Sequence, residues 1–412
     1  MMYYGQYTSR NMTTKPENYI GDLIQKVAYA HNLKNINYTQ EQFESIAQNF
    51  FGVIIPVVLN GTYEDKVVRL HLVLKLAPTD ERYRVSGAVT AMFAREIFVY
   101  TVILKNYQQL QELFPINHQF IIPRSYFVQK DYCQEVIAMQ DMHAEGYKIF
   151  SGGMFLDIDH IIISLESLAK LHALSFIMQI KASDLYNGIS KICIPLTEES
   201  NKRYMDIMRD RLTKALDKFS NTQYVSLLEK LRENCGKFFY STIDSVKKTC
   251  ICHGDIWKEN VLYKYKDDKP ISACLIDYQT TRICSPAFDT LYLIISSTDT
   301  DLRQRYYHQL LDSYYRIFDQ TLKAGNIDSE AVYSRQMLDH DLGVVAPACL
   351  ITANCALWLL NGLQEEGHVR SKLVLATQEE KEKAVLKFKG IVQGMIDDLS
   401  SYGYLGPSQK YL

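Results

Sequence analysis

The residues with the clearest chemical signal lie in the segment CHGDIWKENVL, residues 252–262. Within it, His253, Asp255 and Asn260 have the H-x-D-x-x-x-x-N spacing of a phosphotransfer catalytic loop. At that spacing the carboxylate can accept the proton of an attacking hydroxyl, while the amide oxygen holds a magnesium ion beside it. The segment therefore predicts phosphoryl transfer to a hydroxyl group.

A second carboxylate supports this interpretation. The run ISACLIDYQ, residues 271–279, has β-strand character and ends at Asp277. A carboxylate at the end of a buried strand needs a partner, and a divalent cation shared with nucleotide phosphates is a suitable one. Asn260 and Asp277 are therefore the predicted magnesium ligands, and Asp255 is the predicted catalytic base.

Each of these residues also has a structural interpretation. Asp255 alone could be a helix N-cap, but Asn260 and Asp277 in order argue against that. His253 is predicted to hold the loop backbone by hydrogen bonds instead of transferring protons. Asp289 and His172 are predicted to be buried structural groups, whereas Trp257 either contacts the acceptor or fills the loop.

The bulk composition favours a small-molecule partner. The chain has 412 residues and a formal net charge of −2, which disfavours a broad electrostatic grip on nucleic acid or an anionic membrane. We read no signal peptide at the start, and the nine cysteines, several of them in apolar runs, suit reduced thiols. The expected location is the cytoplasm. Cys250 and Cys252 form a C-x-C without a second pair at zinc-finger spacing.

One apolar stretch is almost long enough to span a membrane. Residues 343–360, GVVAPACLITANCALWLL, carry no charge, but they contain Pro347 and Asn354 and lack basic flanks. We interpret them as a buried helix of a large core and predict no membrane span.

The first part of the chain is predicted to be rich in strands. A helix over residues 16–32 should cover strands at residues 51–59 and 67–76, joined by a turn at Asn60–Gly61. In the second strand, alternation places the leucines on one face and Lys75 on the other.

A helix over residues 91–104 is expected next, with Glu96 on its apolar face. A glutamate in that position needs a cation, and Lys75 is the nearest candidate. A lysine and a glutamate paired between strand and helix orient the lysine towards phosphates in kinase-like folds. The alternative is an exposed Glu96 beside a snorkelling Lys75.

Strands at residues 120–129 and 135–139 complete the first part, and the remainder reads mostly as helix. The predicted fold is α+β and protein-kinase-like with two lobes: a small β-rich lobe over residues 1–142 and a larger, mostly helical lobe over residues 143–412. The predicted helices of the second lobe span residues 161–178, 204–219, 224–245 and 379–399, with a long helical region over residues 300–360.

The chain resembles the ecdysteroid kinase-like family, a branch of the choline kinase and aminoglycoside phosphotransferase superfamily. The matching segments are FAREIFVY (93–100), VIAMQDMHAEGY (136–147), LESLAKLHALSF (165–176), HGDIWKENVLY (253–263), LIDYQ (275–279) and SPAFDTLYLIISS (285–297). The resemblance implies ATP and Mg²⁺ as cofactors and a small-molecule alcohol as acceptor, such as an ecdysteroid or a xenobiotic compound. That implication for the substrate is an analogy between folds.

The resemblance also implies roles for further residues. Lys75 looks like the lysine that holds the phosphates, and Glu96 like its partner. Val73 would cover the adenine. The hinge would consist of Met139, Gln140, Asp141 and Met142, whose backbone groups would read the adenine edge.

One segment departs from the family pattern. The glycine-rich turn corresponds to AQNFFG, residues 47–52, which has alanine where the first glycine is expected. Asn49 keeps the polar position, so the loop is expected to be altered but still to contact ATP. This departure keeps open a catalytically silent kinase-like protein that binds a ligand. A metal-dependent phosphohydrolase is disfavoured because the upstream pair of Lys75 and Glu96 would have no role in it.

Overall fold

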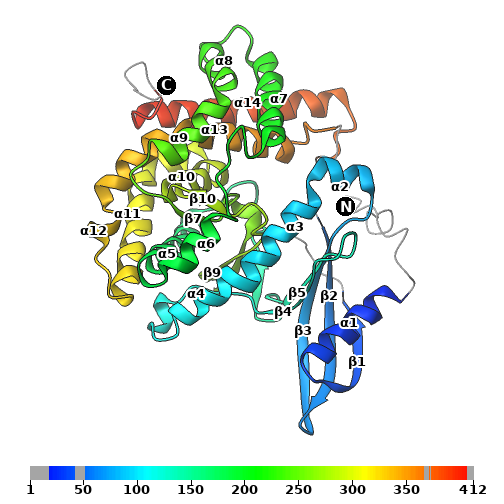
Figure 1. The fold of residues 1–412 in the computed structure, drawn as a ribbon. Helices are drawn as coiled ribbons and strands as arrows, with labels where there is room; N and C mark the ends of the chain where they lie inside the picture. The colour runs from blue at the N-terminus through cyan, green and yellow to red at the C-terminus, as the bar shows by residue number, and fades with distance from the viewer. Residues whose placement is uncertain (1–17, 42–51, 366–370, 372, 406–412) are drawn as a thin grey trace. The chain divides into compact units, whose positions relative to one another are not determined.

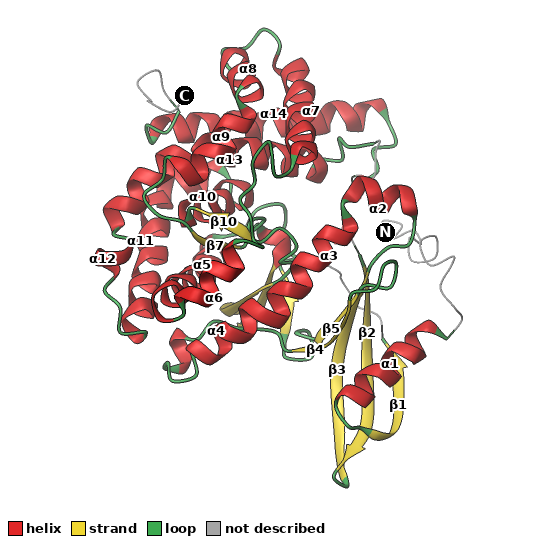
Figure 2. Cartoon of the chain, in the orientation of Figure 1, coloured by secondary structure: helices red, strands yellow, loops and turns green. Residues whose placement is uncertain are grey.

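The computed structural model describes residues 18–41, 52–365, 371 and 373–405. The chain forms two compact units, one of residues 1–105 with 122–149 and one of residues 106–121 with 150–412. The first is built on a sheet and the second is mainly helical (Figures 1 and 2). This confirms the predicted α+β class with a small β-rich part and a larger helical part. The limits of 1–142 and 143–412 remain a prediction.

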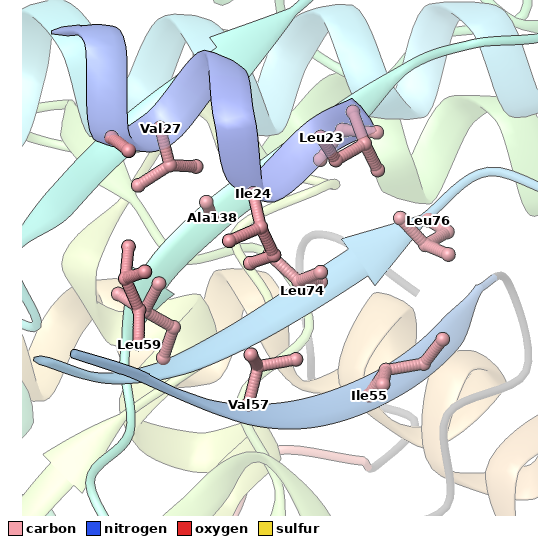
Figure 3. Packing of buried hydrophobic residues seen from close by; sticks show 12 residues of the cluster. Leu23, Ile24, Val27, Ile55, Val57, Leu59, Leu74, Leu76 and Ala138 are labelled. Carbon is pink, nitrogen blue, oxygen red and sulfur yellow. The ribbon is translucent and has the colours of Figure 1, made fainter. Parts of the chain in front are cut away.

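The first unit contains a five-stranded antiparallel sheet in the order β1-β2-β3-β5-β4. Its strands are β1 (Lys34–Gln40), β2 (Val53–Tyr63), β3 (Lys66–Leu76), β4 (Ser125–Gln129) and β5 (Val136–Gln140). Helix α1 (Tyr19–Ala30) lies on one face, where its residues Leu23, Ile24 and Val27 pack against the leucines of β3 (Figure 3). The predicted leucine face is therefore the one that forms the core.

The turn between β2 and β3 was predicted in the wrong place. It lies at Glu64 and Asp65, which both have positive φ angles, of 48° and 61°. Asn60 and Gly61 instead belong to β2 and pair with β3. A Cβ atom on Gly61 would lie 3.2 Å from the carbonyl oxygen of Lys34, so this glycine permits the close approach of β1.

The predicted helix over residues 91–104 is part of a longer helical region. It comprises α3 (Val89–Phe98), a π-helical turn (Val99–Ile103) and α4 (Leu104–Leu110). Helix α2 (Glu81–Gly87) precedes it, and β6 (Tyr147–Ile149) ends the first unit. Glu96 lies on α3 and is buried, as the apolar face predicted.

The second unit surrounds its short strands with helices. The helices before the strands are α5 (Ile158–Lys181), α6 (Ser183–Ser190), α7 (Lys202–Phe219), α8 (Val225–Glu233) and α9 (Cys235–Asp244). The strands are β7 (Cys250–Cys252), β8 (Val261–Lys266), β9 (Lys269–Leu275) and β10 (Arg282–Cys284). The later helices are α10 (Pro286–Ser297), α11 (Thr300–Ala324), α12 (Ser329–Val332), α13 (Arg335–Leu360) and α14 (Gln378–Ser401). The helix predicted over residues 224–245 is thus two helices, α8 and α9.

Two helices of the second unit, α5 and α13, are long and apolar enough to cross a membrane by length and composition alone. Within the protein, 78% of the apolar window of α5 and 94% of that of α13 are buried. The burial of α13 agrees with the prediction of a core helix for residues 343–360.

Candidate active site

The predicted catalytic loop lies between β7 and β8. Strand β7 pairs with β10 through Cys252 and Arg282, and β8 pairs with β9 through Val261 and Leu275. The two pairings hold the loop against residues 276–281, which connect β9 to β10. Asp255, Asn260 and Asp277 are brought together in this way from separate parts of the sequence.

Gly254 sets the backbone path just before Asp255. It has a φ of 87°, and a Cβ atom there would lie 2.3 Å from the carbonyl oxygen of Thr280. Only glycine fits this position without a backbone shift. The guanidinium of Arg282 donates a hydrogen bond of 2.7 Å from Nη1 to the carbonyl oxygen of Gly254. Arg282 therefore helps to fix the loop.

Asp289 of α10 holds the backbone of the same loop through hydrogen bonds. Its carboxylate accepts hydrogen bonds from the backbone N–H of His253 at 2.6 Å and of Gly254 at 3.1 Å. His172 lies 3.2 Å away through Nε2. Burial alone would raise the pKa of Asp289, but the bond to His172 and the nearby positive charges hold it below its usual value. These contacts confirm the structural roles predicted for Asp289 and His172.

His253 and Asn260 complete the loop framework. The His253 ring pairs through Nε2 with the carbonyl oxygen of Ile276 at 2.9 Å. Burial lowers the pKa of His253, which favours the neutral ring. Asn260 donates from Nδ2 to the carbonyl oxygen of Asp255 at 2.8 Å. Because its nitrogen is used in this way, Oδ1 is the atom of Asn260 suited to bind a cation.

Asp277 follows β9 with a φ of 68°, in the left-handed region that non-glycine residues rarely adopt. Burial, and then repulsion from Asp277, raise the pKa of Asp255 to about 7. A carboxylate and an amide oxygen are hard oxygen donors, which suit Mg²⁺. Asn260 and Asp277 thus have the chemistry to hold such an ion. The charge of an ion bound there would act on the Asp255 carboxylate.

Tyr292 and Tyr204 were not identified from the sequence. Tyr292 of α10 is buried and donates from its hydroxyl to Oδ1 of Asp255 at 3.3 Å. Burial raises the pKa of Tyr292 well above its usual value, so its phenol remains a donor. Burial raises the pKa of Tyr204 of α7, and the charges of Arg282 and Asp255 shift that pKa in opposite directions. The SPAFDTLYL segment could have pointed to Tyr292, but Tyr204 lies far from every motif.

Lys75 and Glu96 form the predicted pair within the first unit. The Lys75 ammonium lies 2.5 Å from Oε2 of Glu96, and both side chains are almost fully buried. The same ammonium is 5.9 Å from the ring centroid of Phe93. The expected Lys75–Glu96 ion pair is therefore present, and the exposed alternative is wrong.

Two of the predicted adenine-binding residues, Val73 and Met139, lie on β3, which carries Lys75, and on its neighbour β5. Val73 pairs in the sheet with Met139 of β5, and Met139 and Met142 are buried. The backbone N–H of Gln140 donates to Arg124, and that of Asp141 donates to His71. These two N–H groups are thus already bonded within the unit. The adenine-reading role of Met139–Met142 remains a prediction, and Asn49 lies outside the described residues.

One cluster of potential metal ligands was identified only in part from the sequence, which indicated Cys250 and Cys252 but not their proximity to His172. Among the described residues, a ring nitrogen of His172 and the sulfurs of Cys250 and Cys252 lie within 4.8 Å of one another. Both nitrogens of His172 are already engaged, Nδ1 with the Tyr314 hydroxyl at 2.7 Å and Nε2 with Asp289. The group is better described as a buried hydrogen-bonded network than as a metal site.

Comparison with known proteins identifies a family and several similar solved structures. The family model described as the ecdysteroid kinase-like family matches residues 46–327. Among solved structures, an ethanolamine kinase from Plasmodium vivax is 12% identical, with 98% of this chain and 95% of that chain covered and a TM-score of 0.44. A choline kinase from Cryptosporidium parvum is 13% identical, with 93% and 98% covered and a TM-score of 0.47. A choline/ethanolamine kinase family protein from Mesorhizobium loti is also 13% identical, with 93% and 99% covered and a TM-score of 0.46. No curated protein matches the chain.

Proposed function

Because the chain belongs to the ecdysteroid kinase-like family, we propose that it is an ATP-dependent small-molecule kinase. It transfers the γ-phosphate to a hydroxyl group of a lipophilic alcohol, such as an ecdysteroid or a xenobiotic compound. The proposed site of action is the cytoplasm.

The observation that carries this proposal is the arrangement around Asp255. The loop is fixed by Asp289 and Arg282, and the Asp255 carboxylate itself accepts a hydrogen bond from Tyr292. A carboxylate held in this way can accept the proton of an alcohol as its oxygen attacks the phosphate. With a pKa of about 7 before any cation binds, Asp255 is a stronger base than an ordinary aspartate.

Asn260 and Asp277 would hold Mg²⁺, which neutralises negative charge on the phosphates when bound. Lys75, kept in place by Glu96, would contact the phosphates. Val73 and Met139–Met142 would contact the adenine. The apolar segment of α13 over residues 343–360 carries no charged residue and would suit an apolar acceptor better than a polycation.

The test is transfer of phosphate from labelled ATP to a broad panel of alcohols in the presence of Mg²⁺. We expect turnover by the wild type and a loss of about a thousandfold in Asp255→Asn. Asp301→Asn, an exposed site on α11, is the matched control and should behave as wild type. No transfer to any alcohol, or equal transfer by wild type and Asp255→Asn, would refute the proposal.

A further inference from the structure

Helix α10 holds both the backbone and a side chain of the catalytic loop. Asp289 accepts hydrogen bonds from the backbone N–H groups of His253 and Gly254, at 2.6 and 3.1 Å. Tyr292, three residues later on the helix, donates from its hydroxyl to Oδ1 of Asp255 at 3.3 Å. Residues three apart in a helix lie on the same face, so neighbouring positions of one helical turn make both contacts. The Asp255 side chain is therefore fixed relative to the backbone that carries it.

The Tyr292 side chain is itself held in place. It is 1% exposed, and all of α10 from Pro286 to Ser297 is buried. Its ring packs beside that of Phe288, with 6.1 Å between the two centroids. Among the described residues, the Tyr292 hydroxyl has Oδ1 of Asp255 as its one hydrogen-bond partner. The position of this hydroxyl is thus set by the packing of the helix.

The two oxygens of the Asp255 carboxylate differ in their surroundings. Oδ1 accepts the hydrogen bond from Tyr292, whereas Oδ2 has no hydrogen-bond partner among the described residues. Oδ2 is also absent from the fully buried polar atoms that lack a partner in the described part of the chain, so it keeps contact with solvent. The backbone of Asp255 is tied on both sides, to His253 through its N–H at 3.4 Å and to Asn260 through its carbonyl oxygen at 2.8 Å. Oδ2 is therefore the carboxylate oxygen that is open to a reactant.

A carboxyl group without such a hydrogen bond turns readily about its Cβ–Cγ bond. The torsion about that bond is broad and nearly two-fold, so the two oxygens can exchange places. Accepting a proton during the attack requires one oxygen close to the reacting hydroxyl, and a displacement of about 1 Å can cost about a hundredfold in rate. The hydrogen bond from Tyr292 restricts this rotation.

We propose that Tyr292 is a positioning residue, which holds Oδ1 of Asp255 so that Oδ2 accepts the proton of the acceptor alcohol. The inference rests on the proposed kinase function. In that reaction the alcohol oxygen bonds to the γ-phosphorus, and the bond from this phosphorus to the ADP oxygen breaks with its electron pair left on ADP. The alcohol proton moves to Oδ2. Tyr292 contacts no reactant and keeps its own proton.

The first experiment measures phosphate transfer from labelled ATP in a single turnover, with the alcohol that the wild type phosphorylates fastest. Tyr292→Phe should lower the transfer rate by about tenfold, because the carboxylate regains its rotation. The KM values for ATP and for the alcohol should stay within about twofold of the wild type, since Tyr292 contacts neither. Tyr292→4-aminophenylalanine, which restores an N–H donor at the same place, should recover most of the lost rate. A rate equal to that of the wild type in Tyr292→Phe, or no recovery with the amino group, would overturn the proposal.

Tyr333→Phe is the matched control. Tyr333 is also buried, and its hydroxyl donates to Oδ2 of Asp341 at 3.0 Å, so the variant removes a bond between a phenol and a carboxylate away from the loop. Its transfer rate should equal that of the wild type. Equal losses of rate in Tyr333→Phe and Tyr292→Phe would show that the effect of Tyr292 is a general effect on the fold.

The second experiment needs neither turnover nor a ligand. Tm is measured at pH 8 for the wild type, Tyr292→Phe, Asp255→Ala and the double variant. Tyr292→Phe should lower Tm by about 2–3 °C in the wild type, because the carboxylate loses its donor. In the Asp255→Ala background the hydroxyl has already lost its acceptor, so the same change should cause no further loss. Equal losses in both backgrounds would overturn the proposal.

The two experiments separate this inference from the kinase proposal. If the Tm values show the coupling between Tyr292 and Asp255 but no alcohol is phosphorylated, the hydrogen bond is retained and the kinase function fails. If alcohols are phosphorylated but the coupling is absent, or Tyr292→Phe transfers phosphate as fast as the wild type, the kinase function is retained and the positioning role fails.

Discussion

At the scale of single residues, the surroundings of Asp255 disfavour the ionised form of its carboxyl group. Burial and Asp277 raise its pKa from 3.8 to about 7, whereas the nearby Arg282 and the Tyr292 hydroxyl act in the opposite direction. A group with a raised pKa in the folded state costs no stability while it is protonated in both states, below about pH 4. The cost grows as the pH rises and is complete above about pH 7.

Asp255→Asn should therefore stabilise the protein in a pH-dependent way. We expect its free energy of unfolding to match the wild type near pH 4 and to exceed it by about 1–3 kcal/mol at pH 8. Denaturant titrations at both pH values measure the difference. Mg²⁺ should reduce it, because a bound cation offsets the repulsion between Asp255 and Asp277. A difference that is the same at pH 4 and pH 8 would contradict this account of the site.

Asp289 gives a second prediction at this scale, since it holds the loop while touching no reactant. Asp289→Asn should destabilise the fold by about 2–4 kcal/mol and also lower turnover, because the backbone of His253 and Gly254 loses its charged acceptor. Thermal unfolding and kcat are the measurements.

Asp341 of α13 supplies the matched control for Asp289. It is equally buried, and its carboxylate accepts hydrogen bonds from the Lys247 N–H, Ser285 and Tyr333. Asp341→Asn should destabilise the fold to a similar extent and leave the kcat of the folded protein unchanged. Equal effects of both variants on kcat would show that Asp289 has no special connection to the loop.

At the scale of elements, the structural and chemical roles of the ion pair between Lys75 of β3 and Glu96 of α3 can be tested separately. Removing one partner of the buried pair, as in Lys75→Met or Glu96→Gln, should cost about 3–5 kcal/mol. Replacing both, in Lys75→Met/Glu96→Leu, should recover most of that stability because no buried charge is left unpaired. Turnover should stay low in all three variants. Recovered turnover in the double variant would exclude a phosphate-binding role for Lys75.

Arg84 of α2 and Glu135 form a comparable buried pair of 2.5 Å in the same unit. Replacing both by Met and Leu is the control for the double variant of Lys75 and Glu96. It tests the loss of a buried ion pair as such, and ATP turnover should persist.

The elements also show what the sequence could predict. The alternation in residues 67–76 identified the leucine face and the direction of Lys75, because a period of two has a single solution once one face is buried. The Asn60–Gly61 pair gave a wrong prediction of the turn. The same dipeptide that favours a turn also permits the close approach of β1. Strand β1 itself was missed, because its KNINYTQ sequence is mostly polar and exposed.

The residues of the candidate site also differ in whether the sequence alone could identify them. Asp255, Asn260 and Asp277 could be found from spacing, because the loop and the following strand are local in sequence. Arg282 and Tyr204 could not, because their relation to Asp255 depends on the packing of β10 and α7, which no short-range pattern specifies.

At the scale of the whole molecule, the family match ends at residue 327, but the core of the second unit does not. Helix α13 packs against α10, and Arg303 of α11 pairs with Asp398 of α14 at 2.7 Å, with both side chains buried. The region after residue 327 is therefore an integral part of the fold that supports Asp289.

A chain truncated after residue 327 should fail to unfold cooperatively, because α10 and α11 would lose their buried partners. Circular dichroism during thermal unfolding tests this. Removing the exposed ion pair Lys383–Glu379 on α14 in the full chain should leave the cooperative transition unchanged. A sharp, wild-type transition in the truncated chain would show that these helices are dispensable.

The central claim, that Asp255 serves phosphate transfer to an alcohol, is tested most directly by one measurement. Labelled ATP, Mg²⁺ and the alcohol panel are mixed with excess enzyme, and phosphorylated alcohol is quantified in a single turnover. We predict rapid transfer by the wild type and about a thousandfold slower transfer by Asp255→Asn at equal occupancy by ATP. Transfer at the same rate by both proteins, or by neither, would contradict the claim.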